Sequence, residues 1–234
     1  MTVHQHLTRV GAVAAVSGAL TLFIATLLHP MNADPNDPAV AFAEYAADQL
    51  WVASHLGQFV GVAVLGVALV ALAGTMENGK SSAWARIGAL GAAASVATTA
   101  ALQAVDGVAL KVVVNRWAEA SGEAQARAFE GAFAVRQIEI GLASLLSLVF
   151  GLTISAFGIS LLLSRRFPRW LGLLALVGGL GTVAAGIGQA YTGFSAVSMN
   201  LSMSAASILL LWAIAAGVFM WRLAPQLPGP DGAV

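Results

Sequence analysis

Residues 170–221 read WLGLLALVGGLGTVAAGIGQAYTGFSAVSMNLSMSAASILLLWAIAAGVFMW and contain no charged side chain. A helix needs about 20 apolar residues to cross the hydrocarbon core of a bilayer. This stretch of 52 residues is therefore too long for a single crossing. Its most polar and glycine-rich part is GIGQAYTG at 186–193, where we expect a turn. The stretch predicts two membrane helices, over 169–189 and 199–222.

Four more runs without charged residues precede this pair, and each is long enough for one crossing. The first run is longer than the apolar part of a usual signal peptide, and no small-x-small cleavage site follows it, so we interpret it as a retained helix. The expected ranges of these four helices are 9–29, 50–76, 83–106 and 137–163. We therefore predict an all-α polytopic membrane protein, with one six-helix domain over 1–222 and a flexible cytoplasmic tail over 223–234.

The overall composition agrees with this prediction. Hydrophobic residues make up 59% of the chain, charged residues only 9%, and the mean hydropathy is +0.83. A soluble domain is about one-quarter charged, and a protein of this size cannot hide so much apolar surface from water. The balance of 11 basic and 11 acidic residues argues against a nucleic-acid partner. The absence of cysteine from the sequence excludes thiol nucleophiles, thiolate metal sites and disulfides.

The charges of the loops predict the orientation in the membrane. Seven basic residues lie at the end that holds the N-terminus: Arg9, Lys80, Arg86, Arg165, Arg166, Arg169 and Arg222. The loops of the other end carry four basic residues among seven acidic ones. The positive-inside rule then places both termini in the cytoplasm, and we predict a multi-pass protein of the bacterial plasma (inner) membrane. Trp51 is expected in the aromatic belt of the outer interface.

Two segments at the outer end are predicted to be helical. Asp37 followed by Pro38 is typical of a helix start, and we expect a short helix over 39–47 that lies on the membrane surface. Residues 107–137 have helical preference throughout, interrupted only at Ser121 and Gly122. The third and fourth membrane helices are therefore predicted to continue outside the bilayer as a helical hairpin.

Small residues predict where the helices pack against one another. The helix over 137–163 carries a small residue at every fourth position between Ala143 and Ser155. Small faces let helix backbones approach closely in lipid. They also allow a homo-oligomer, because the sequence does not say whether they pack within one chain or between chains. The helix over 83–106 is so rich in alanine and glycine that we expect it at the centre of the bundle.

The polar residues with most chemical potential fall at one depth. Four ionisable residues, each from a different predicted helix, lie 20 to 25 residues from the cytoplasmic end of that helix, which is about 30 Å or slightly more. Gln58 shares a helical face with His55, and Gln103 shares one with Asp106, each at a spacing of three. We expect a polar cavity that opens outward. The candidate ligand-binding residues are His29, His55, Gln58, Gln103, Asp106 and Glu139.

Several interpretations of this polar level remain open. The structural one is that Asp106 pairs with Lys111 or Arg136 and that the charges are partly hydrated. As a functional site, His29, His55, Asp106 and Glu139 could hold zinc, iron or manganese, or the two histidines could hold a haem. His55 or Glu139 could instead act as an acid or base on a lipophilic substrate.

The leading hypothesis is a membrane protein that binds a lipophilic small molecule or a lipid in this cavity. The first alternative is a membrane-embedded enzyme that uses the same groups, with a metal, a haem or acid–base chemistry. The second alternative is a transporter or channel subunit. It is disfavoured because the predicted helices are almost uncharged at the bilayer midplane, where ion-coupled transporters usually carry charges.

The layout also resembles a bacterial six-helix membrane family of unknown function. The resembling parts are the polar loop over 29–48, the Trp51-x-x-x-His55 start of the second helix, and RFPRWLG at 166–172. The alanine-rich composition resembles that of actinobacterial proteins. The resemblance implies the six-helix topology, and it implies no catalytic residues.

Overall fold

The computed structural model describes residues 1–76 and 79–227, and over these residues it is all-α. Six of its helical stretches are long and apolar enough to cross a membrane, as the sequence predicts. Each stretch contains one of six helices: α1 (Val3–Leu27), α3 (Trp51–Gly74), α4 (Lys80–Gln103), α6 (Gly122–Leu163), α7 (Arg169–Thr192) and α8 (Ala196–Leu223). The α4 stretch continues without a break through the π-helix η1 (Ala104–Leu110) into α5 (Lys111–Glu119).

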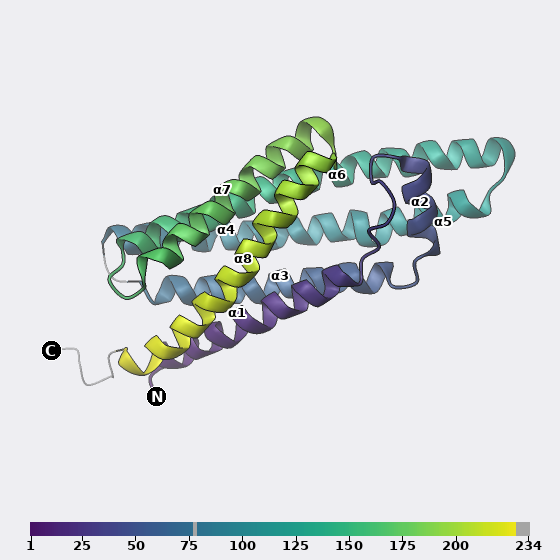
Figure 1. Ribbon diagram of the computed structural model, residues 1–234. Coiled ribbons are helices and arrows are strands. Elements are labelled where there is room, and N and C mark those ends of the chain that lie inside the picture. Colours follow the sequence, from purple (N-terminus) through teal and green to yellow (C-terminus); the bar gives the residue numbers. More distant parts are fainter. Residues whose placement is uncertain (77–78, 228–234) are drawn as a thin grey trace.

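The two ends of the bundle are built differently. Near the N-terminus, the Gln5 side-chain amide donates to the carbonyl of Leu227 at 3.0 Å, so both ends of the described chain meet there. Figure 1 shows α2 (Pro38–Ala47) and α5 together at the opposite end, beside the first part of α6. Residues 224–226, which the sequence assigns to a flexible tail, form a 3-10 turn before a buried Leu227. The rest of that predicted tail, 228–234, lies outside the described residues.

The short helix α2 begins as predicted but packs differently. The Asp37 side chain accepts from the Val40 amide at 3.3 Å, and Pro38 occupies the first turn. The sequence predicts a position on the membrane surface, and the structure shows that the apolar face of α2 packs against α5. Phe42 and Tyr45 are buried there with Val114 and Ala132, which belong to α5 and α6.

The turn predicted at 186–193 is displaced toward the C-terminus. Helix α7 continues to Thr192, and the chain turns at Gly193, whose φ of 60° favours glycine. The glycines before it serve packing instead of turning. A Cβ on Gly186 would lie 2.9 Å from the carbonyl oxygen of Ser144, so this part of α7 rests directly on the backbone of α6.

The prediction that the helix over 83–106 is central is wrong. Only 28% of the most apolar window of the α4 stretch is buried, compared with 50% in α6. Helix α6 packs against both α4 and α7 and forms the middle of the bundle. The small residues of α4 receive larger side chains from α6, as where Gly88 faces the ring of Phe157. Small residues therefore mark a close contact on one face, and they do not require neighbours on all sides.

Candidate functional site

A buried ion pair joins α3 to η1. His55 lies in the first turns of α3 and is 1% exposed. Its Nε2 is 3.0 Å from Oδ2 of Asp106, and its Nδ1 is 2.6 Å from the carbonyl oxygen of Trp51. A carbonyl and a carboxylate both accept hydrogen bonds, so the two contacts together require a proton on each side of the ring. One proton therefore lies between Nε2 of His55 and Oδ2 of Asp106, and another lies between Nδ1 and the carbonyl of Trp51.

The π-helix η1 brings Asp106 to this position. Seven residues in π conformation interrupt the stretch from α4 to α5, and such segments are frequent at functional sites. Gly107 lets η1 approach α3, because a Cβ at this position would lie 2.5 Å from the Cβ of His55. The indole N–H of Trp51 donates to the backbone carbonyl of Asp106 at 3.0 Å and closes the contact.

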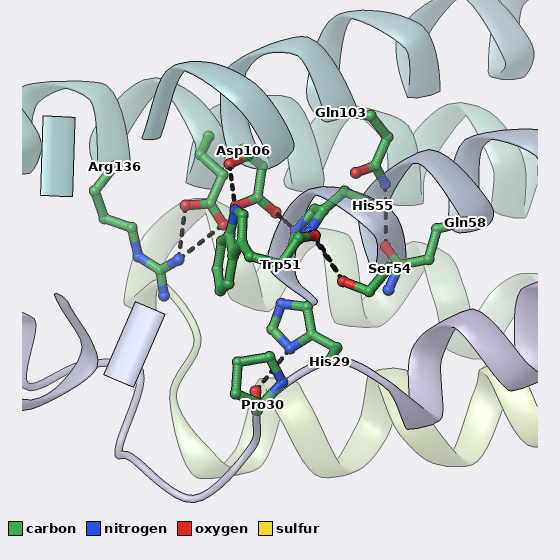
Figure 2. Close-up of polar contacts among 10 residues, drawn as sticks. His29, Pro30, Trp51, Ser54, His55, Gln58, Gln103, Asp106 and Arg136 are labelled. Atoms are coloured by element: carbon green, nitrogen blue, oxygen red, sulfur yellow. Dashed lines mark hydrogen bonds and ion pairs between the residues drawn. The ribbon is translucent and has the colours of Figure 1, made fainter. Parts of the chain in front are cut away.

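His29 lies directly after α1 and faces this pair, as Figure 2 shows. Its ring centroid is 4.9 Å from that of Trp51 and 5.0 Å from that of His55. Burial, and then the charge of His55, lower the pKa of His29 below the ordinary 6.5, so its ring is neutral at pH 7. Nδ1 is 2.7 Å from the carbonyl oxygen of Pro30 and must carry the single proton. Nε2 is then an unprotonated acceptor, and no described residue donates a hydrogen bond to it.

A second buried ion pair lies beside the first and fastens the surrounding segments together. Arg136 Nη1 donates to both carboxylate oxygens of Glu139, at 2.9 and 2.6 Å, and Nη2 donates to the carbonyl of Pro35 at 3.2 Å. The guanidinium also lies 4.8 Å from the ring centroid of Phe194 and 5.4 Å from that of Tyr45. Burial raises the pKa of Tyr45 to about 12, against the attraction of Arg136, so the phenol is neutral.

The two glutamines of the predicted set contact each other. The Gln103 amide donates to Oε1 of Gln58 at 3.2 Å, which joins α4 to α3 on the side of His55 away from Arg136 (Figure 2). Deeper along α4, the hydroxyls of Ser95 and Thr99 donate to carbonyls of their own helix.

Two grooves along the described helices lie away from the predicted polar cavity. A groove of about 520 Å³ runs along α1, α3 and α4 and is mainly apolar, with Leu7, Val67 and Ala92 in its walls. It borders none of the six candidate residues. Around the candidates, His55, Gln103 and Glu139 are buried, while His29, Gln58 and Asp106 are half-buried. The polar level is thus a packed cluster, and His29 is one of its three half-buried members.

The ligand geometry for a metal or a haem is not formed. Among residues 1–76 and 79–227, no group of three or more His, Cys, Asp or Glu side chains is arranged to hold a metal ion. Both nitrogens of His55 and both oxygens of Glu139 already have partners within the protein. A haem between two axial histidines needs their rings on opposite sides of a gap, and the rings of His29 and His55 contact each other.

Two structural expectations at this end are wrong. Asp106 pairs with His55 and with neither Lys111 nor Arg136, because both cations are engaged elsewhere. The ammonium of Lys111 donates to three carbonyls at the end of α2, at 2.7 to 2.9 Å. Trp51 is 1% exposed and lies inside the cluster, and not in an interfacial belt, because its indole N–H is used by η1.

Sequence reasoning missed several contributors to the site. The stacking of Tyr45 and Trp51, with ring centroids 4.3 Å apart, follows from the packing of α2, which spacing alone does not predict. The carbonyls of Pro30 and Pro35 orient His29 and Arg136, and any residue could have supplied a carbonyl. We find no sequence signal for the π-helix. For Trp51, its position four residues before His55 on one helical face was an available signal.

No protein-family model, curated protein or solved structure matches this chain. The resemblance to a six-helix membrane family therefore remains a prediction. The geometry of the cluster and the six apolar helices that carry it are the features from which a function can be inferred.

The loop that follows His29 is expected to loosen in acid. Glu44 accepts from both nitrogens of Asn32, at 3.1 and 3.0 Å, and from the Ala33 amide at 2.9 Å. Desolvation alone would raise the pKa of Glu44, but the hydrogen bonds from Ala33 and Asn32 outweigh it and lower the pKa below the ordinary 4.5. A lowered folded-state pKa stabilises the loop above about pH 4.5, and this stabilisation is lost as the pH falls through the lower value.

Amide hydrogen exchange, corrected for its intrinsic pH dependence, tests this expectation. Protection at Asn32 and Ala33 should fall between about pH 7 and about pH 3 in the wild type. Glu44→Gln removes the titration and should give the same weakened protection at every pH. Undiminished protection of the wild-type loop at the acid end would contradict the expectation.

Proposed function

We propose that this chain is a multi-pass membrane protein that binds a lipophilic small molecule or a lipid at the end of the bundle formed by α2, η1 and α5. The observation that carries the proposal is the half-buried ring of His29. It presents an unpaired Nε2 beside the fixed pair of His55 and Asp106. Ligand sites typically combine apolar walls with a few fixed polar groups. The exposed side chains of Leu27, Leu28 and Met31, next to His29 in the chain, supply apolar surface for a ligand tail.

The proposal includes an orientation in the bacterial plasma membrane. Both termini are placed in the cytoplasm, and the His29 cluster lies at the level of the outer leaflet. The positive-inside distribution of the loops supports this orientation. The helical segments from η1 through the first part of α6 then project beyond the outer hydrocarbon boundary. Labelling of single cysteines, introduced at Ser121 and at Arg9, by an impermeant reagent on intact cells tests the orientation.

Ligand-dependent stabilisation tests the proposed function directly. The purified protein, in phosphatidylcholine nanodiscs, is unfolded thermally with four probes: decylubiquinone, dodecylamine, 1-monododecanoylglycerol and dodecyl phosphate. A probe present at 100 times its Kd stabilises the folded state by about 2.7 kcal/mol, which for a chain of this size raises Tm by about 5–10 °C. At least one probe should do so.

A matched pair of histidine variants locates the effect. His29→Phe keeps an aromatic ring against Trp51 but removes Nε2, and it should abolish the rise in Tm. His6→Phe alters an exposed histidine near the other end of the same helix and should leave the rise unchanged. If all four probes leave Tm unchanged in the wild type, the proposed function is wrong.

The second candidate function is acid–base catalysis on the same kind of molecule. It is favoured by one observation: the unprotonated Nε2 of His29 can take a proton from a bound hydroxyl group, and His55 with Asp106 lies directly behind it. Mass spectrometry of each probe after prolonged incubation separates the two functions. A binding protein returns the probes unchanged, whereas an enzyme that accepts one of them converts it and loses this activity in His29→Phe.

A further inference from the structure

Two unpaired polar atoms of the cluster, Nε2 of His29 and Oδ1 of Asp106, are acceptors. Nε2 of His29 carries no proton, because the single proton of the neutral ring is on the nitrogen that faces Pro30. Oδ2 of Asp106 contacts His55, while Oδ1 of Asp106 is buried and has no partner among the described residues. Buried acceptors are almost always paired in folded proteins. A molecule that enters at His29 therefore gains most if it brings hydrogen-bond donors.

The two basic side chains of this end that are not exposed are already used. Lys111 is held by the three carbonyls at the end of α2, and Arg136 is held by Glu139 and by the carbonyl of Pro35. A phosphate or carboxylate head is normally recognised by a free guanidinium or ammonium group. Neither side chain can turn toward such a head without abandoning its buried acceptors.

The net negative charge of the surrounding segments also disfavours an anionic head group. Residues 28–50 and 104–139 contain nine acidic and four basic side chains. The acidic residues are Asp34, Asp37, Glu44, Asp48, Asp106, Glu119, Glu123, Glu130 and Glu139. A surface with this excess of negative charge attracts cations and repels anions before any contact forms.

We infer that the molecule bound at His29 is an amphiphile whose head donates hydrogen bonds and carries no negative charge, such as a hydroxyl or an ammonium group on an alkyl tail. This inference rests on the proposed function and specifies its ligand class. The head group donates to Nε2 of His29, and the acidic surroundings favour it over an anionic head of the same size. Lipids with an anionic phosphate head and no ammonium group are thereby excluded as the preferred ligands.

Three dodecyl probes that differ in the head group test the inference. Dodecylamine and 1-monododecanoylglycerol offer donors, while dodecyl phosphate offers an anionic head on a comparable tail. Each is titrated below its micellar concentration at pH 7 into the wild type in phosphatidylcholine nanodiscs, whose choline head donates no N–H or O–H hydrogen bond. We expect the two donor probes to bind at least ten times more tightly than dodecyl phosphate. His29→Phe should remove this preference, and His6→Phe should keep it.

The outcomes separate the inference from the proposed function. If dodecyl phosphate binds as tightly as the donor probes, and His29→Phe weakens its binding, the ligand class is wrong while the site stands. If no probe binds, or if binding is indifferent to His29→Phe, both the ligand class and the proposed function fail. The ranking of probes is measured on the wild type, so it decides the ligand class even if the variant does not fold.

Discussion

Replacing Arg136 with methionine is expected to lower the free energy of unfolding by about 3–5 kcal/mol. The side chains of Arg136 and Glu139 are at most 6% exposed, so the substitution leaves a buried carboxylate without its cation. It also removes the donor to the Pro35 carbonyl, which fixes the loop between α1 and α2. A buried ion pair adds little net stability over an apolar pair, but breaking it is costly, because the remaining charge has lost both water and partner. Reversible unfolding in mixed micelles of SDS measures the loss.

Two comparisons make this prediction specific. The double variant Arg136→Met with Glu139→Met removes both charges and should recover most of the lost stability. On the same helix, Arg127 and Glu123 form an exposed pair with an N–O distance of 3.5 Å, and Arg127→Met should cost about 0.5 kcal/mol or less. Equal losses of unfolding free energy in Arg136→Met and Arg127→Met would contradict the prediction that breaking the buried pair is the costlier change.

The six apolar helices could be predicted because they depend only on where charged residues interrupt the chain. The depth of the polar residues followed from the same counting, since the rise per residue of a helix is fixed. His29, His55 and Asp106, from three separate segments, do lie together. Which of them pair could not be predicted, because pairing depends on how each helix is rotated. The π-helix η1 changes that rotation at Asp106 itself.

The remaining errors have a related physical cause. Tryptophan is typical of a membrane interface, but the indole N–H of Trp51 donates to the backbone of η1 and the ring is buried. Several glycines near residue 186 are typical of a turn, but in lipid glycines also allow close helix packing. The contact with α6 keeps this segment helical. Composition identifies which local structures are possible, and a tertiary partner selects one of them.

Helices α6 and α7 are expected to separate when a large side chain is placed at Gly151. The two helices run with their backbones in contact at three levels, seven residues apart on each helix. Ser144 faces Gly186, Gly151 faces Gly179, and Gly158 faces Gly172. A Cβ on Gly151 would lie 2.6 Å from the carbonyl oxygen of Gly179, which is backbone and has no rotamer to adopt.

Gly151→Leu should therefore lower the free energy of unfolding by about 3 kcal/mol or more, at the upper end of the cost of overpacking. Gly151→Ala should cost less, because a single methyl group needs a smaller separation. Gly141→Leu is the matched control, since a Cβ at Gly141 on the same helix meets nothing within 4 Å. Its cost should stay within about 0.5 kcal/mol.

The same unfolding assay measures all three variants, and a Gly151→Leu protein as stable as Gly141→Leu would contradict the backbone contact. Because α6 also carries Arg136 and Glu139, Gly151→Leu should weaken probe binding at His29 as well, whereas Gly141→Leu should not.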